Sequence, residues 1–111
     1  MNLEQYLNNN INYNLETVIQ LLEKEKYFFA MSFSEFPKAT EYLTENIQGN
    51  KCLLIYTSES IAKKAHYDKW HIFKYKISEI EKILIASKSN SICINYGFNW
   101  LVLQFKKENS P

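Results

Sequence analysis

The chain contains no arginine, and Asp68 is its only aspartate. Its charged side chains are 13 lysines and 12 acidic residues. Lysine lacks the planar, forked guanidinium group that holds a phosphate, a carboxylate or a guanine edge with two hydrogen bonds. The absence of arginine therefore disfavours sequence-specific reading of DNA and a clamp for phosphoryl transfer.

Glycine, proline and cysteine are scarce, with two residues of each among 111. This scarcity excludes collagen-like chains, low-complexity chains and domains built on a disulfide framework. The glycine-rich motifs of nucleotide-binding loops and the Gly-x-Ser-x-Gly motif of serine hydrolases are also missing. Gly49 and Gly97 are the only glycines, and each suits a turn.

Long hydrophobic runs and targeting signals are missing as well. No apolar run approaches the roughly 18 residues that a membrane-spanning helix requires. The first six residues lack the basic stretch and the apolar run of a signal peptide. Cys52 and Cys93 lie within apolar, strand-like runs, so we expect them to be reduced and buried. Together these features predict a cytoplasmic protein with no role at a membrane.

The chain is rich in apolar and aromatic side chains. Hydrophobic residues make up 46% of it and charged residues 23%, which is typical of a globular protein. At this length a chain forms one domain and buries roughly 60–70% of its unfolded surface. We therefore expect a single domain over residues 1–111, with residues 1–13 and 106–111 loosely ordered.

The hydrophobic pattern predicts alternating helices and strands. Three apolar runs predict buried strands, at residues 27–33, 51–57 and 70–75. Helical spacing predicts three helices, which begin at Asn14, Ser58 and Ser78. In the last of these, Ser78 and Glu81 have the spacing of a capping box.

The end of the chain predicts a β-hairpin, because two apolar runs flank a short turn that contains Gly97. The runs cover residues 91–96 and 100–105. The expected fold is thus an α/β (α+β) sandwich, in which helices pack on a mixed sheet of about five strands that ends in the hairpin.

Residues 34–50 allow two interpretations. Pro37 at a first helical position, followed by Ala39, Leu43 and Ile47 on one face, would give a helix. Residues 40–45 would equally form an edge strand that turns through Gly49 into the next strand. We favour the edge strand, for a reason that comes from the following resemblance.

The sequence of residues 51–105 resembles the N-terminal domain of the SseB family (enhanced serine sensitivity proteins). Residues 54–59 read Leu-Ile-Tyr-Thr-Ser-Glu, similar to the family's apolar strand that runs into Phe-Thr-Ser and an acidic helix start. Residues 94–97 read Ile-Asn-Tyr-Gly, similar to the family's Ile-Asn-Pro strand end, except that Tyr96 replaces the proline. The family also has a strand between its first strand and the Thr-Ser strand, which favours the edge strand at residues 40–45.

The resemblance implies a small α/β module without a known catalytic site. Some relatives look like accessory domains, and similar small modules are found among toxin-immunity systems. The matching motifs are strand ends and helix caps, and none of them carries chemistry.

Catalytic and metal sites have little support in the sequence. His66 and His71 are the only histidines, and Cys52 and Cys93 do not have the spacing of a zinc site. A nucleophile at Cys93 would need an oriented base that the sequence does not place beside it. We therefore expect no enzyme activity, no metal and no cofactor.

One stretch has the composition of a nucleic-acid surface. Residues 63–76 place several lysines among aromatic residues, including Lys63, Lys64, Lys69 and Trp70. Amines could contact phosphates there while rings stack on bases. The net charge of +1 is low for a phosphate binder, so we favour a solvated basic face as the explanation of this stretch.

A second candidate surface lies around the expected hairpin turn, at Tyr96, Phe98 and Trp100. A ring at the tip of a hairpin cannot be fully buried, and exposed aromatic rings are common anchors of protein interfaces. The alternative is that these rings fold back over the core.

Charge is divided unevenly along the chain, with a net −4 in residues 1–50 and +5 in residues 51–111. If the two halves pack side by side, they form two oppositely charged faces that can steer a protein partner, and the favoured alternative is a solvated mosaic of both charges. We expect a non-enzymatic, SseB-like module that binds another protein, and the neutralisation of a bacterial toxin or effector is its most concrete form. The alternative is a nucleic-acid-associated accessory factor that uses the basic stretch.

Overall fold

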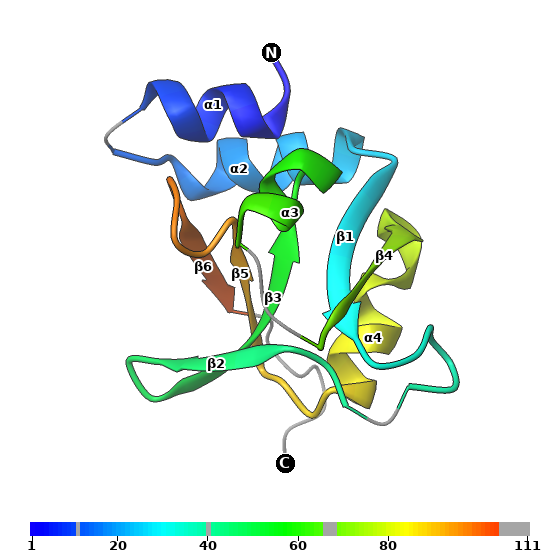
Figure 1. The fold of residues 1–111 in the computed structure, drawn as a ribbon. Coiled ribbons are helices and arrows are strands. Elements are labelled where there is room, and N and C mark those ends of the chain that lie inside the picture. The colour runs from blue at the N-terminus through cyan, green and yellow to red at the C-terminus, as the bar shows by residue number, and fades with distance from the viewer. Residues whose placement is uncertain (11, 40, 66–68, 105–111) are drawn as a thin grey trace.

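The computed structural model describes residues 1–10, 12–39, 41–65 and 69–104. In these residues a mixed six-stranded sheet packs against four α-helices and a short 3-10 helix, η1 (Figure 1). The α+β class predicted from the sequence is confirmed, with six strands in place of about five. The elements in chain order are α1 Leu3–Asn9, α2 Leu15–Lys24, β1 Tyr27–Ser32, β2 Thr44–Ile47, β3 Asn50–Tyr56, α3 Glu59–Ala65, β4 His71–Lys76, η1 Ile77–Glu79, α4 Ile80–Ala86, β5 Ser91–Ile94 and β6 Leu101–Gln104.

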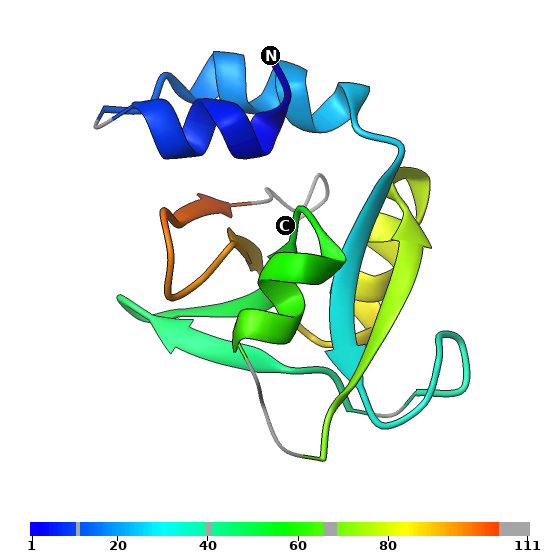
Figure 2. The ribbon, with the colours of Figure 1, turned by 45° about the horizontal axis from the view of Figure 1, so that its top comes forward.

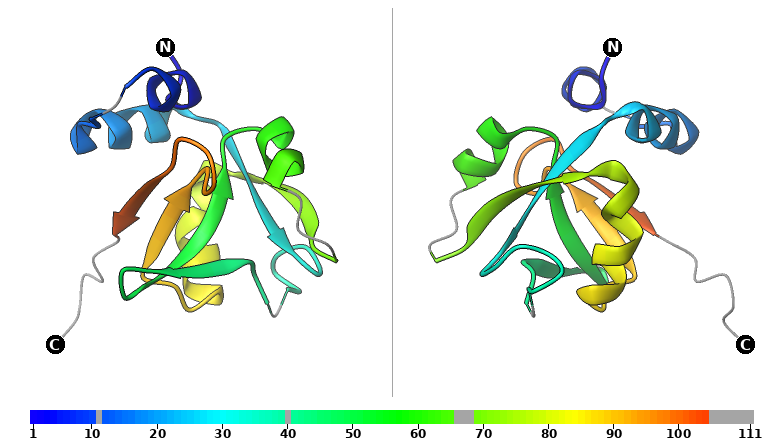
Figure 3. Two further views of the ribbon diagram at one scale, coloured as in Figure 1. Left: turned by 60° about the vertical axis from the view of Figure 1, so that its left-hand side comes forward. Right: turned by 90° about the vertical axis from the view of Figure 1, so that its right-hand side faces the viewer.

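Strand β3 organises the sheet because it pairs with three other strands. Along one side it pairs antiparallel with β1 near its carboxyl end and with β2 near its amino end. Along the other side it pairs parallel with β5. Strand β4 lies outside β1 and β6 outside β5, which gives the order β4-β1-β3-β5-β6. The two views of Figure 3 show β4 and β6 at opposite rims of the sheet.

Both faces of the sheet are covered, as the continuous apolar run of β3 predicts. Leu53 and Ile55 belong to a core cluster that also contains residues of α1, α2 and α4. Leu54 and Tyr56 belong to a second cluster on the opposite face, where α3 contributes Ala62. The seven-residue α3 is thus the helix on one face, and the other three α-helices share the opposite face (Figure 3).

Residues 3–9 of the N-terminal segment form the helix α1. Asn2 caps this helix, since its Oδ1 accepts a hydrogen bond from the Gln5 backbone N–H at 2.8 Å. Leu3 and Leu7 are fully buried in the core. Helix α1 lies beside α2 (Figure 2), which begins after Asn14 as predicted. Residues 106–111 lie outside the described residues.

The segment before β3 forms the edge strand that we favoured, although it is shifted along the chain. Strand β2 begins at Thr44, and in the described part of residues 34–50 there is no helix. Leu43, just before the strand, donates its backbone N–H to Met31 O at 2.8 Å and accepts from Leu54 N–H at 3.2 Å. The turn into β3 uses Gln48 and Gly49, both with positive φ.

Two predicted helix starts have different outcomes. Ser58 caps α3, because its Oγ accepts from the Ile61 backbone N–H at 3.2 Å. The capping box predicted for Ser78 and Glu81 is wrong, since the short 3-10 helix η1 precedes α4 and no side chain caps α4. Glu79 instead accepts the Lys76 backbone N–H through its Oε1 at 3.2 Å.

Candidate functional site

The hairpin predicted at the end of the chain is confirmed by antiparallel pairing of β5 with β6. The six residues 95–100 connect the two strands, and we call this segment the aromatic loop. Phe98 is 39% exposed and Trp100 is 40% exposed, whereas Tyr96 is half-buried. The rings of Tyr96 and Trp100 meet edge to face with their centroids 5.4 Å apart. The structure therefore brings two of the three predicted residues into contact and leaves rings exposed.

A buried asparagine fixes the backbone of the aromatic loop. Asn95 is buried and has a left-handed backbone conformation, with φ of 58°. Its Oδ1 accepts from Thr57 N–H and its Nδ2 donates to Thr57 Oγ1, both at 3.0 Å. Thr57 Oγ1 in turn donates to Glu4 Oε1 of α1 at 2.8 Å. The loop is thus joined to the carboxyl end of β3 and to α1.

The aromatic loop also contacts α1 near its second end, where Asn99 Nδ2 donates a hydrogen bond to Asn8 Oδ1 at 2.8 Å. Asparagine tolerates the left-handed conformation better than most residues, which is the one local signal for a special role of Asn95. No local pattern predicts that Thr57 and Glu4 are its partners, since both lie more than 35 residues away.

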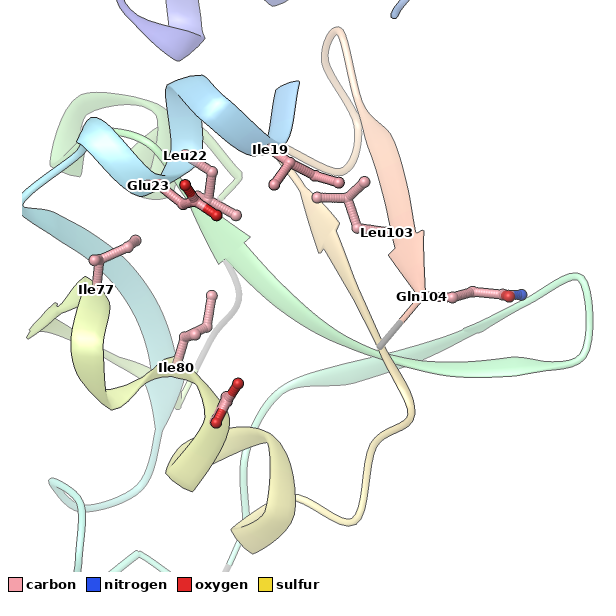
Figure 4. A pocket seen from close by; sticks show the side chains of 8 residues that line it. Ile19, Leu22, Glu23, Ile77, Ile80, Leu103 and Gln104 are labelled. Atoms are coloured by element: carbon pink, nitrogen blue, oxygen red, sulfur yellow. The ribbon is translucent and has the colours of Figure 1, made fainter. Parts of the chain in front are cut away.

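A groove between α2 and α4 was not expected from the sequence. We call it the helix groove, and it has a volume of about 370 Å³. Figure 4 shows Ile19 and Leu22 of α2 on one side of it and Ile77 and Ile80 on another. Leu103 of β6 points toward α2 in this view. The groove is lined by Ile19, Leu22, Glu23, Ile77, Ile80, Glu81, Leu103 and Gln104.

The helix groove is apolar in its interior and acidic in its charge. Its lining includes three residues that also belong to the core, Leu22, Ile80 and Leu103. Ile19 lines it as well and is 45% exposed. Among the described residues, Glu23 and Glu81 are the two charged residues that line it, and no described lysine does. The helical spacing of the apolar residues in α2 could be read from the sequence, but the approach of α4 and β6 is a tertiary feature.

Two side chains of the basic stretch, Lys63 and Trp70, make contacts within the protein. Lys63 lies 3.4 Å from the Glu59 carboxylate in an exposed ion pair on α3. Trp70 is half-buried, and its ring stacks on Phe33 with centroids 4.4 Å apart. Lys64 and Lys69 are exposed. The rest of the predicted stretch includes residues 66–68, which lie outside the described residues.

Trp70 also lines a second hollow, of about 400 Å³, between the segment before β2 and the end of α4. Of the described residues that line it, Lys51 and Lys88 are basic and Glu41 is acidic. Trp70 thus lines the same hollow as Lys51 and Lys88, which are distant from it in the sequence.

The cysteines have the surroundings of core residues. Cys52 and Cys93 are free thiols, both fully buried on the same face of the sheet. Burial raises the pKa of Cys93 to about 12, with a smaller contribution from Cys52, and burial also raises the pKa of Cys52. A thiol with a raised pKa stays protonated near neutral pH, and the thiolate is the reactive form.

The described part of the chain contains neither a cluster of metal ligands nor a membrane-spanning helix. There, no three residues of the His, Cys, Asp and Glu types gather in a way that could hold a metal ion. His71 is exposed at the start of β4, and His66 lies outside the described residues. None of the described helices has the length and apolar character needed to cross a bilayer.

A scan against protein-family models gives no match over the chain, and a search of curated proteins finds no significantly similar sequence.

Proposed function

We propose that this protein is a non-enzymatic module that binds another protein, and that the aromatic loop is part of its binding surface. The observation that carries the proposal is the exposure of Phe98 and Trp100 in a loop whose backbone is held by Asn95. Aromatic anchors contribute a large share of the affinity at many protein interfaces. A loop that is already held in place loses little conformational entropy when it binds.

Two further observations support a binding role. The buried thiol of Cys93 lacks the accessibility that a nucleophile needs. In the described residues the polar side chains of Asn95, Thr57 and Glu4 hydrogen-bond to one another, which accounts for this polar cluster as a support of the aromatic loop.

The most concrete form of this proposal is a toxin-immunity role. The SseB-like sequence of residues 51–105 supports it, because similar small modules are found in toxin-immunity systems. In that role the protein would act in the cytoplasm as a stoichiometric inhibitor of a bacterial toxin or effector. Such a role needs neither a metal nor a cofactor.

The test is to tag the protein, recover it from a lysate of its own source, and identify co-eluting proteins by mass spectrometry. We expect one stoichiometric partner. Substituting both Phe98→Ala and Trp100→Ala is expected to reduce the amount of captured partner at least about tenfold. Tyr27→Ala is the matched control, since Tyr27 is an aromatic residue with 43% exposure on β1. Capture that is equal in the double variant and in the control would overturn the role of the aromatic loop.

A second candidate function is nucleic-acid binding, favoured by one observation. Trp70 lines a hollow together with Lys51 and Lys88, where a base could stack while amines contact a phosphate. This function predicts binding of a single-stranded oligonucleotide that weakens steeply as salt rises. Absence of binding at about 50 mM salt would exclude this candidate.

A further inference from the structure

We infer that the outer edge of β6 and the helix groove together accept an extended segment of another protein, with an apolar residue flanked two positions away by basic residues. The segment would pair with β6 as an added strand and place its apolar side chain in the groove. This inference rests on the proposed function, because it gives the shape and charge of the partner.

The first step concerns the free edge of β6. Strand β6 pairs with β5 on one side, and in residues 1–104, apart from the gaps given above, no strand pairs with its other side. Figure 3 shows β6 at the rim of the sheet. An edge strand presents unpaired backbone N–H and C=O groups, and peptides often bind by adding a strand there.

The second step compares β6 with the other outer strands. Proteins protect edge strands with charged residues, above all lysine. Strand β4 at the opposite rim carries Lys74 and Lys76, and β2 carries Glu45. Strand β6 reads Leu-Val-Leu-Gln and has no charge. Of these three strands, β6 is therefore the one suited to accept a partner.

The third step is the position of the helix groove relative to β6. Leu101 and Leu103 face the cluster that contains α2 and α4, whereas Val102 faces the opposite side. A strand added to β6 would lie about 4.8 Å away and would place every second side chain on the face of Leu103. Those side chains would enter the groove beside Ile19, which is only partly covered (Figure 4).

The same side of α2 offers more uncovered apolar surface. Leu15 lies one turn before Ile19 and is 55% exposed. Residues four positions apart lie on the same side of a helix. An added strand would thus cover apolar surface on both β6 and α2.

The fourth step is the charge of the partner. Glu23 and Glu81 line the helix groove on α2 and α4, and within the part of the chain that the structure describes no lysine lines it. A basic side chain on the groove side of the added strand would meet these carboxylates. Since side chains on one face of a strand are two positions apart, the basic residues flank the apolar residue at that spacing.

The inference can be tested with short synthetic peptides and the full chain. The probe is the acetylated and amidated peptide Thr-Lys-Thr-Ile-Thr-Lys-Thr, and the reference is Thr-Glu-Thr-Ile-Thr-Glu-Thr. Binding is followed by the amide shifts of residues 101–104 and the methyl shifts of Ile19 and Ile80 in NMR spectra. We expect saturable shifts with the basic peptide, and weaker binding or none with the acidic one.

Two variants test the charge, and one modified peptide tests the backbone pairing. Substituting both Glu23→Gln and Glu81→Gln is expected to lower the affinity for the basic peptide by about fivefold. Glu16→Gln is the control, because it removes a charge from α2 without lining the groove. A basic peptide that is N-methylated at the third and fourth positions lacks a backbone donor on each of its two edges and is expected to lose the shifts at β6.

Several outcomes would overturn the inference. One is equal binding of the basic and the acidic peptide, and another is a set of shifts confined to residues outside β6 and the helix groove. A third is a shift of the β6 signals that depends on protein concentration without any peptide, because a second copy of the chain would then pair with the edge. If the basic peptide fails while the Phe98 and Trp100 variants still lose their partner, this inference falls and the proposed function stands. If the peptide binds but those variants keep their partner, the role of the aromatic loop falls instead.

Discussion

Both polar atoms of the Asn95 side chain are hydrogen-bonded to Thr57. The Asn95 Oδ1 accepts the Thr57 backbone N–H and the Asn95 Nδ2 donates to Thr57 Oγ1, each at 3.0 Å. Because Thr57 Oγ1 accepts the amide proton, its own proton is available for Glu4 Oε1, 2.8 Å away. One buried amide therefore joins the ends of two parallel strands to α1 and positions the aromatic loop.

Asn95→Ala is predicted to lower the free energy of unfolding by about 2–4 kcal/mol. The substitution leaves the half-buried Thr57 N–H without its acceptor, and a donor that loses its acceptor away from water costs about 1–3 kcal/mol. It also puts alanine in a left-handed conformation, at about 1 kcal/mol. Urea unfolding followed by tryptophan fluorescence gives the value. Asn99→Ala is the control, with a change within about 0.5 kcal/mol, because its hydrogen bond to Asn8 is exposed.

Asn95→Gly separates the two contributions. Glycine adopts a positive φ without strain, so this variant loses only the side-chain hydrogen bonds. It is predicted to be more stable than Asn95→Ala. Equal stability of Asn95→Ala and the wild type would contradict a structural role for the amide.

Leu7→Ala is predicted to lower the free energy of unfolding by about 2–4 kcal/mol, because it opens a cavity in the core. Leu7 is fully buried on α1. Asn9→Ala is the matched control on the same helix, where Asn9 is exposed, and its effect is predicted to stay within about 0.5 kcal/mol. Urea unfolding of both variants is the measurement. Equal stabilities of the two would mean that residues 1–9 are as loosely held as their sequence suggests.

The strands and helices with strong patterns could be predicted from the sequence. The apolar run at the centre of β3 requires cover on both faces, and it has that cover. Asn14 caps α2 through a hydrogen bond from Thr17 N–H, as its position before an amphipathic run indicates. The hairpin of β5 and β6 follows from two apolar runs around Gly97.

The features that were missed depend on contacts between distant residues. Helix α1 is short and rich in asparagine, so its own sequence predicts little order, and packing of Leu3 and Leu7 supplies it. Strand β2 begins only where pairing with Leu53 becomes available. The helix groove exists because Ile19, Ile80 and Leu103 meet from three elements, which no local pattern encodes.

Tyr42→Phe is predicted to leave stability at pH 7 within about 1 kcal/mol of the wild type. Tyr42 is buried, and its hydroxyl has no hydrogen-bond partner in the described residues, so removing the hydroxyl breaks no bond there. The measurement is urea unfolding at pH 7. A loss well above 1 kcal/mol would show that the hydroxyl has a stabilising partner.

Tyr42→Phe is also predicted to lose less stability than the wild type as the pH rises into the alkaline range. Burial, with a smaller contribution from Tyr75, raises the pKa of Tyr42 from 10.0 to about 12. A pKa that is higher in the folded state stabilises the fold fully below pH 10, and this stabilisation is lost as the pH rises toward 12. Between pH 10 and 12 the wild type should therefore lose more stability than Tyr42→Phe. Parallel profiles would contradict a raised pKa.

Cys93 is predicted to resist alkylation in the folded protein at pH 8. Its side chain is fully buried, and burial raises its pKa to about 12, so the thiol is both inaccessible and protonated. Iodoacetamide should react at least about 1000-fold more slowly with the native protein than with the protein in urea, since reaction requires unfolding. Mass mapping of the modified peptides distinguishes Cys93 from Cys52. Rapid, selective modification of native Cys93 would contradict this burial and restore the thiol as a candidate nucleophile.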